Sequence, residues 1–296
     1  MTNCNNCGCT DSKPIFAFKG YQLVTCQNCA LTYVSNPPDE AALDKLYSND
    51  ANDYHADLLD PASFQYRRIA RITRNHMNFI GKVANGGRLV DVGCSTGQFL
   101  GMAASMGFDA SGIELSQRSA DFARQQTGLS IERGRIHDTA LTAESVDMLT
   151  MFDVIEHVTD PSSDIAAAYN LLKPGGWLVL STPNIDGLFP RASYPLADAL
   201  GYWPHPEPPH HLFQFSVKTL TAMLEKSGFE PGPVHHLNID LAYSFGSAST
   251  LIRMPKRLAY AAVFAPLAKL GPMIGQGDWF YMAARKPMAG AGAMAA

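Results

Sequence analysis

The segment RLVDVGCSTGQFL, residues 88–100, carries two patterns that point to different chemistry. Gly93, Ser95 and Gly97 match GxSxG, the turn that presents the nucleophile of serine hydrolases. Asp91 followed by the same two glycines also matches a loop that lets a nucleotide-like cofactor approach the backbone. Both interpretations require a strand, a tight turn and a helix, so the segment alone does not decide between them.

The surrounding sequence favours the cofactor loop. A hydrolase nucleophile normally follows several strands, one of which leads into the oxyanion loop, and no such sheet is predicted before Ser95. A cofactor loop instead predicts an acidic residue at the end of the next strand, where it binds both ribose hydroxyls, and Glu114 in GIELS stands there. The loop lacks the GxGxxG spacing of dinucleotide-binding proteins, which argues against NAD. A GxSxG hydrolase is therefore the remote alternative.

The N-terminal cysteines predict a metal site. Two CxxC pairs, Cys4 with Cys7 and Cys26 with Cys29, are separated by 18 residues, as in two knuckles that close one tetrahedral zinc site. Protein would occupy all four positions, so the zinc is predicted to be structural. Cys9 is an alternative ligand in place of Cys7.

Histidines and carboxylates downstream could act on a second substrate. If the reaction deprotonates a hydroxyl group, a histidine is the natural general base. The candidates are His157, His205, His210 and His211. A catalytic metal is the weaker interpretation, with the ligand groups Asp153, Glu156, His157 and His205, Glu207, His210.

An open α/β sheet must position these residues, because strand and helix patterns alternate from residue 88 onward. Strands are predicted over 88–92, 109–115, 129–134, 146–152, 177–182, 229–237 and 278–286. Helices are predicted over 98–106, after Ser116, from Asp160-Pro161 to Gly175-Gly176, and after Ser216.

Ahead of this sheet the sequence predicts two smaller units, a zinc ribbon over 1–38 and a helical neck over 39–80. In the neck, Asp39 caps a short helix and Asp60 before Pro61 opens a longer one.

Composition excludes several classes of function. The 296 residues, 46% of them hydrophobic, can bury the core of one large domain with a small satellite. The 23 basic and 27 acidic residues give no positive surplus for nucleic acid. The N-terminus has no apolar signal region, and the strongly apolar run LAYAAVFAPLA has 11 residues where a bilayer span needs about 20. We therefore expect a cytoplasmic protein.

Four motifs together carry a family resemblance: LVDVGCSTGQFL, GIEL, MFDVIEHVTDP and LLKPGGWLVLSTPN. In order and spacing they resemble the class I S-adenosylmethionine-dependent methyltransferases. HHLFQFSVKTLTAMLEKSGF resembles the ubiquinone-type O-methyltransferase branch, and the ribbon is similar to a leader found on a subset of these enzymes that act on small molecules. The resemblance implies a Rossmann-like sheet of seven mostly parallel strands with the last antiparallel. The resemblance covers about residues 81–230. From the residues we expect one methyltransferase domain over 81–296, with a lid at 184–215 and a helical insertion at 240–276.

The resemblance also implies roles for individual residues. Asp91 would contact the methionyl end of the cofactor, Glu114 the ribose and Ile136 the adenine. The full cofactor set is Asp91, Gly93, Cys94, Gly97, Glu114, Leu115, Ile136, Phe152 and Asp153. Cys94 is expected to fill the loop and not to act as a nucleophile. His157 beside the cofactor and His211 under the lid are the catalytic candidates.

The acceptor is expected to be a small molecule or a glycan that is methylated on oxygen. Carbon methylation of a sugar nucleotide is one alternative. Another is a lipid-linked or prenylated substrate, because Arg253, Lys256, Arg257 and Lys269 lie among apolar residues in the insertion and could dock a helical cap on a membrane. A helical hairpin packed over the sheet is the favoured interpretation of this insertion.

Overall fold

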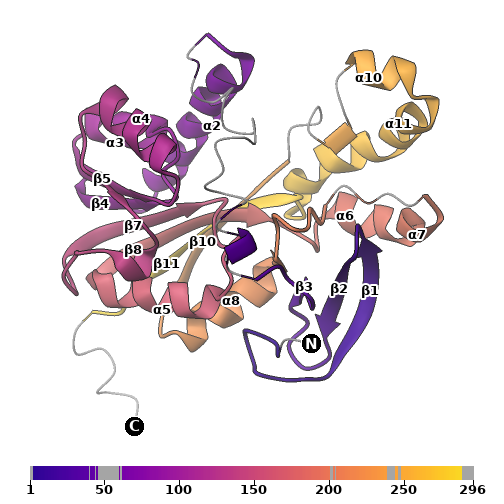
Figure 1. Ribbon diagram of the computed structural model, residues 1–296, viewed down its shortest axis with the longest axis horizontal. Coiled ribbons are helices and arrows are strands. Elements are labelled where there is room, and N and C mark those ends of the chain that lie inside the picture. The colour runs from indigo at the N-terminus through magenta and orange to yellow at the C-terminus, as the bar shows by residue number, and fades with distance from the viewer. Residues whose placement is uncertain are drawn as a thin grey trace.

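The structure is a computed structural model. It describes residues 3–39, 41–43, 45, 60, 62–200, 203, 205–238, 244–245 and 248–288. Its centre is a seven-stranded sheet in the order β10-β11-β8-β7-β4-β5-β6 (Figure 1). The strands are β4 (Gly87–Val92), β5 (Phe108–Glu114), β6 (Ile131–Arg133), β7 (Val146–Phe152), β8 (Leu172–Pro183), β10 (Glu230–Leu237) and β11 (Trp279–Arg285). Strands β4 to β8 pair in parallel, and β11 runs antiparallel to β8. The predicted Rossmann-like α/β sheet with an antiparallel last strand is confirmed.

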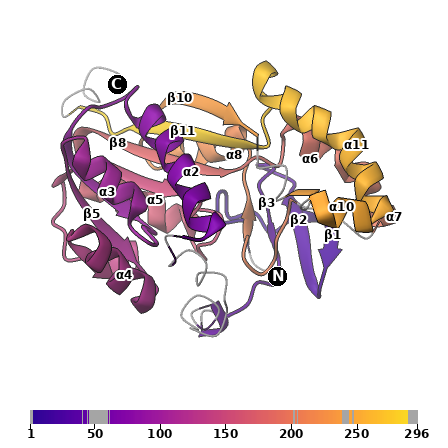
Figure 2. The ribbon, with the colours of Figure 1, turned by 90° about the horizontal axis from the view of Figure 1, so that it is seen from above.

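Helices cover both faces of this sheet, so its central strands are buried on both sides. On one face lie α2 (Phe64–Ile80), α3 (Gln98–Ser105) and α4 (Gln117–Thr127), and on the other α5 (Pro161–Leu171) and α8 (Val217–Lys226) (Figures 1 and 2). Each face has its own apolar core. The carboxyl ends of β4, β5 and β7 consequently meet at one edge, where ligands bind in open α/β sheets.

Capping residues set most of the helix starts as the sequence predicts. The Ser116 side chain accepts a hydrogen bond from the backbone N–H of Ser119 at the start of α4. Asp160 and Ser216 cap α5 and α8 in the same way. In the neck, an Asp39 carboxylate oxygen accepts from the N–H of Ala42 at 2.8 Å. The rest of the predicted neck between residues 46 and 59 lies outside the described residues.

Two predicted helix boundaries are wrong. Helix α2 begins after Ser63, whose side chain accepts from the N–H of Tyr66, and Asp60 instead forms the preceding turn. Helix α5 ends at Leu171, not at the glycine pair, and β8 begins at once with Leu172. Pro174 explains the early end, because a proline disfavours helical backbone at the residue before it.

The ribbon forms a second, antiparallel sheet from β1 (Ser12–Phe18), β2 (Tyr21–Cys26), β3 (Thr32–Val34) and β9 (Phe213–Gln214). Strand β9 belongs to the segment that was predicted to be a lid, and it pairs Phe213 with Tyr33. The ribbon residues Leu31 and Tyr33 are buried in the same core as α5 and α8. The ribbon is thus joined to the large sheet through the lid segment.

The lid segment also carries α6 (Leu188–Ser193), η3 (Tyr194–Leu196) and α7 (Ala197–Leu200). The insertion forms α10 (Ala248–Arg253), α11 (Pro255–Leu270) and η4 (Gly271–Ile274). Helix α11 packs on α6 through an apolar cluster that includes Phe189 and Phe264, so the hairpin predicted to lie over the sheet lies beside the lid instead (Figure 1). The placement of residues 239–243 and 246–247 of this insertion is outside the described part of the chain.

None of the helices in the described ranges combines the length and the apolar character that a membrane crossing requires.

Candidate active site

Asp91 lies beneath the cofactor loop and not on its surface. It is 4% exposed, and its carboxylate accepts a hydrogen bond from the Thr150 hydroxyl of the neighbouring strand β7 at 2.6 Å. Burial raises the pKa of Asp91 to about 7, although the Thr150 hydrogen bond acts in the opposite direction. The side chain therefore ties β4 to β7 directly below the turn that follows it.

The two glycines of the loop meet different steric requirements. Gly93 has φ +76°, and a Cβ atom there would lie 2.5 Å from a methyl carbon of Val154. Gly97 has φ +74°, and its Cβ atom would lie 3.0 Å from the Cβ of Ala123 in α4. Gly93 thus permits the turn beside β7, whereas Gly97 permits close packing of α3 on α4.

Glu114 is held at the end of β5 by the loop itself. One carboxylate oxygen accepts from the N–H of Ser95 at 2.9 Å, and the other accepts from the N–H of Ser116 at 2.8 Å. Burial raises the pKa of Glu114, while these backbone hydrogen bonds oppose the shift. Each oxygen keeps a lone pair for a further donor, so the carboxylate is oriented in advance for a pair of hydroxyl groups.

Ser95 and Cys94 have structural roles in the loop. Ser95 adopts φ +49° and uses its backbone N–H to hold Glu114. Cys94 is buried against Gly112, where an added Cβ atom would lie 2.6 Å from the Cys94 sulfur. Burial raises the pKa of this thiol, which keeps it protonated and unreactive.

Phe152, at the end of β7, is covered by a residue that sequence reasoning did not assign to the site. The His76 ring of α2 stacks on it with 3.9 Å between ring centroids, and Phe99 meets it edge-on. Burial lowers the pKa of His76 to about 3, and its Nδ1 atom has no hydrogen-bond partner among the described residues. The available signal was a polar residue on an otherwise apolar helix face.

Asp153 follows Phe152 with φ +55° and is fixed by two donors. Its carboxylate accepts from the Ser181 hydroxyl at 2.6 Å and from the indole N–H of Trp279 at 2.8 Å. Burial raises its pKa against the effect of both hydrogen bonds. Trp279 belongs to the antiparallel strand β11, and no local sequence pattern connects it with Asp153.

The other predicted cofactor residues, Leu115 and Ile136, follow β5 and β6, and Ile136 is buried in the core.

His157 and His211 lie against each other, with ring centroids 4.8 Å apart and ring planes at 75°. The Nδ1 atom of His157 is 2.9 Å from the carbonyl oxygen of His210. Because a carbonyl only accepts, we assign the proton to Nδ1, which leaves the lone pair on Nε2. Burial lowers the pKa of His157 to about 4, so its imidazole is neutral near pH 7. Burial lowers the pKa of His211 as well.

Glu156 completes this group. It is 1% exposed, and neither carboxylate oxygen has hydrogen-bond geometry with a described residue, although Thr182 lies close enough to oppose the rise in its pKa. Burial, followed by the charge of Asp153, raises that pKa well above its usual range. Ligand atoms of Glu156, His157 and His211 lie within 4.8 Å of one another, a grouping that could hold a metal ion. The structure groups these three and not the two metal sets considered from the sequence.

The lid strand positions His211. The backbone N–H groups of Leu212 and Phe213 both donate to the carbonyl oxygen of Glu156, at 2.8 and 3.1 Å. Phe213 continues into β9, which pairs with β3 of the ribbon. The ribbon, the lid and the loop after β7 therefore meet at the histidine pair.

The four cysteines of the two CxxC pairs converge at the base of the ribbon. The Sγ atoms of Cys4 and Cys29 are 3.4 Å apart, and those of Cys7 and Cys26 are 3.5 Å apart. Tetrahedral zinc with Zn–S bonds of about 2.3 Å places its sulfurs roughly 3.8 Å apart, so the group has the size of a zinc site. Cys9 stays outside it, and its sulfur accepts from the N–H of Asp11 at 3.4 Å.

Two surface hollows border these elements, and Thr96 and Gly97 of the loop after β4 line the first of them. One, of about 350 Å³, lies between α2 and α3, and the other, of about 390 Å³, lies beside β4 to β6. Neither is lined by Asp91, Glu114 or His157. The chemistry of the side chains, and not the size of a hollow, therefore locates the candidate site.

Comparison with known proteins identifies related sequences. A family profile described as "Methyltransferase domain" matches residues 64–233. A ubiquinone biosynthesis O-methyltransferase from Bordetella avium is 32% identical over 155 residues, which cover 49% of this chain and 62% of the relative. One from Leptothrix cholodnii is 35% identical over 136 residues, 42% of this chain and 57% of the relative. The match thus spans less than two thirds of these relatives.

Solved structures share the fold at low sequence identity. A methyltransferase from Thermotoga maritima that depends on S-adenosylmethionine has a TM-score of 0.54 at 20% identity, covering 82% of this chain and 99% of its own. Phosphoethanolamine N-methyltransferase 2 from Haemonchus contortus, in complex with S-adenosyl-L-methionine, has a TM-score of 0.55 at 16% identity, covering 87% of this chain and 62% of its own.

Proposed function

Because the chain belongs to the methyltransferase-domain family, we propose that it transfers a methyl group from S-adenosylmethionine to a hydroxyl oxygen of a small molecule. The observation that carries the choice of oxygen is His157, a partly exposed, neutral imidazole whose Nδ1 proton is held by a carbonyl. The Nε2 atom carries the lone pair and can accept a proton from a hydroxyl group. Similarity to O-methyltransferases named for ubiquinone biosynthesis supports the same choice.

The cofactor is assigned to the ends of β4, β5 and β7. Glu114 binds the ribose hydroxyls, because both of its oxygens are already oriented by backbone N–H groups. The loop at Gly93, supported from below by Asp91, binds the methionyl part. Leu115 and Ile136 flank the adenine. Phe152 and Asp153 line the methionine side.

His157 acts as the general base. When bound, S-adenosylmethionine supplies a methyl carbon on a positively charged sulfur, which leaves as a neutral thioether. His157 accepts the hydroxyl proton on Nε2 while the acceptor oxygen forms its bond to the methyl carbon. His211 packs on the His157 ring and restricts its orientation. Most of the rate gain then comes from alignment and from the exclusion of water.

Zinc is assigned to Cys4, Cys7, Cys26 and Cys29. Its role is structural, because four thiolates fill a tetrahedral shell and leave no position for a substrate. The ribbon is small, and metal binding stabilises such segments where apolar burial is limited. Through β3 and β9 the metal also supports the strand that follows His211.

Calorimetry with S-adenosylmethionine tests the cofactor assignment. Glu114→Gln replaces a charged acceptor by a neutral amide, and we expect the Kd to rise about 10- to 100-fold, as for the loss of one or two charged hydrogen bonds. Glu225→Gln, on the exposed side of α8, is the matched control and should leave the Kd unchanged. If the unaltered chain binds no cofactor, the proposal is wrong.

Mass spectrometry then tests the reaction. The protein is incubated with cofactor and a panel of phenols, catechols and sugar nucleotides, and S-adenosylhomocysteine is measured together with the methylated product. Proton and carbon NMR of the product distinguishes a methyl on oxygen from one on carbon. A methyl on carbon would overturn the choice of oxygen and leave the cofactor assignment intact.

A further inference from the structure

Exposed apolar side chains are concentrated in the helical insertion. Among the described residues, twelve large apolar side chains are exposed, and seven of them lie within residues 252–274. The most exposed are Met273 at 82% and Ile252 at 78%. The seven are Ile252, Met254, Leu258, Val263, Leu270, Met273 and Ile274. Single apolar residues are common on protein surfaces, but a concentration of this kind marks an interaction site.

Helix α11 is apolar on both of its faces. Its inner face, with Tyr260, Phe264 and Ala268, packs against Phe189 and Phe245. Its outer face exposes Leu258, Ala259, Ala262, Val263, Pro266 and Leu270. A helix that borders water on one side normally carries polar residues there. The outer face of α11 therefore needs an apolar partner.

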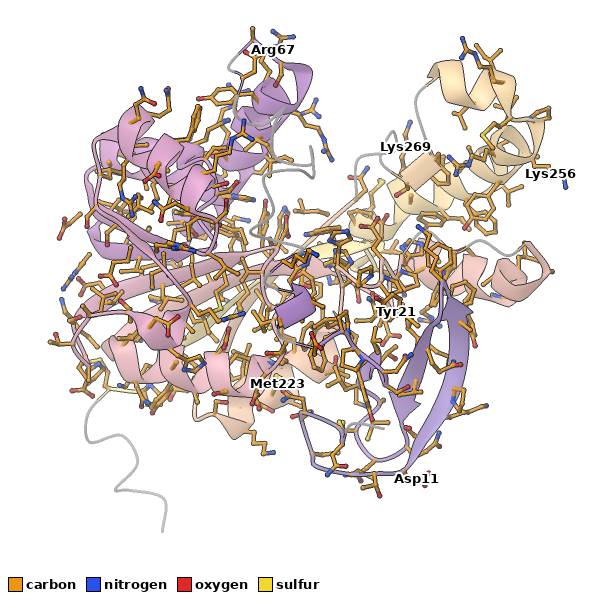
Figure 3. All side chains as sticks on the ribbon, viewed as in Figure 1. Asp11, Tyr21, Arg67, Met223, Lys256 and Lys269 are labelled. Atoms are coloured by element: carbon orange, nitrogen blue, oxygen red, sulfur yellow. The ribbon has the colours of Figure 1, made fainter. Side chains whose placement is uncertain are left out.

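The charge of the same segment identifies the kind of partner. Between Asp240 and Asp278 the sequence has four basic residues, Arg253, Lys256, Arg257 and Lys269, and no acidic residue. The whole chain has a formal net charge of −4. Lys256 and Lys269 stand near opposite ends of α11, and both are exposed (Figure 3). An apolar helix face bordered by lysines is the pattern of helices that lie in a membrane interface.

We propose that residues 248–274, comprising α10, α11 and η4, dock on the surface of an anionic lipid bilayer. The outer face of α11 enters the boundary between headgroups and acyl chains, and the exposed residues Arg253, Lys256 and Lys269 contact lipid phosphates. The segment stands beside the lid helix α6, away from the faces of the main sheet, so it can reach a flat surface (Figures 1 and 2). This inference does not depend on the proposed methyl transfer.

Vesicle flotation of the full chain tests the proposal. We expect binding to vesicles of phosphatidylcholine and phosphatidylglycerol at 70:30, weaker binding to phosphatidylcholine alone, and weaker binding in high salt. Val263→Asp combined with Met273→Asp should abolish flotation. Met106→Asp is the control, because Met106 is 57% exposed at the end of α3 and outside the insertion.

Reversing the charge of two lysines tests the electrostatic contribution to vesicle binding. Lys256→Glu with Lys269→Glu should lower the vesicle partition coefficient roughly 10- to 30-fold, as expected when two basic contacts to anionic lipid are lost. Lys13→Glu with Lys218→Glu changes two exposed lysines elsewhere and should have little effect. Circular dichroism and cofactor calorimetry verify that each variant is folded.

Two outcomes would overturn the proposal. One is unaltered flotation of the Val263→Asp, Met273→Asp variant. The other is failure of the unaltered chain to bind anionic vesicles. If that chain is a dimer by light scattering and the dimer is lost in the same variant, the face is instead an interface between copies.

Discussion

The cofactor loop and the histidine pair adjoin the same edge of the sheet, but their polar groups are satisfied to very different degrees. Asp91 and Glu114 both have hydrogen-bond partners within the fold. At the histidine pair, both Glu156 carboxylate oxygens and the Nδ1 atom of His211 are buried without a hydrogen bond among the described residues, and Glu156 Oε1 lies 4.0 Å from His157 Nε2. An unsatisfied buried polar atom costs about 1 to 3 kcal/mol. Under the proposed function, the cofactor side, at the loop after β4, has its polar groups paired in advance, whereas the acceptor side, at the histidine pair, keeps buried polar atoms that a bound molecule would complete.

The largest effect should come from the acceptor side. His157→Ala should lower kcat about 10²- to 10⁴-fold, because a general base contributes an effect of that size. The Kd for S-adenosylmethionine should change by less than about twofold, since His157 does not support the loop at Gly93. Single-turnover kinetics and calorimetry measure the two quantities. His235→Ala, an exposed histidine of β10, is the control. Loss of cofactor affinity in His157→Ala would show that the two sides are not separate.

A substitution in the loop after β4 should instead weaken cofactor binding. In Gly93→Ala the added methyl group meets Val154 at 2.5 Å in a backbone conformation that disfavours side chains. Overpacking and backbone strain together should weaken cofactor binding about 100-fold by calorimetry. Gly128→Ala has a similar φ of +69° with no atom within 4 Å of the added carbon, so it isolates the cost of strain. Equal losses in the two variants would remove the clash with Val154 as the cause.

Loss of zinc from the ribbon should lower kcat and leave cofactor affinity unchanged. Cys26→Ser should remove the zinc, measured as metal per chain, and lower kcat about 10- to 100-fold because the strand after His211 loses its support. Cofactor affinity should stay within about twofold. Cys9→Ser, at a cysteine outside the thiol group, should keep both metal and activity. Normal turnover in a zinc-free chain would contradict the structural role.

The smallest effect concerns pH. Because burial lowers the pKa of His157 to about 4, its base form persists well below the usual histidine range. We expect the His157 base to be lost only near pH 4, so that kcat/KM falls there, and any smaller change between pH 5.5 and 7.5 belongs to Asp91, whose pKa burial raises to about 7. The same group binds a proton more readily when unfolded, so its contribution to stability falls as the pH drops from 6.5 towards 4. An activity midpoint near 6.5 would mean that His157 is solvated or is not the base.

Local sequence pattern predicts this structure best where a residue shapes the backbone of its neighbours in the chain. The caps at Ser116, Asp160 and Ser216 and the seven strands follow from local pattern and are confirmed. The end of α5 ahead of Gly175-Gly176 also has a local cause, because Pro174 disfavours helical backbone at the residue before it. His76 and Trp279 could not be placed at the site, since neither lies in a motif and both reach it from other elements.

Local pattern is enough to predict the fold class, the glycine turn after β4 and an acidic residue at the end of β5, because backbone preference and side-chain alternation act over a few residues. The grouping of Glu156, His157 and His211, and the extension of the ribbon to that group through β9, arise from packing between distant elements. Tertiary packing also left the outer face of α11 exposed. These outcomes depend on which layers pack together across long separations in the chain, and local sequence patterns do not specify that packing.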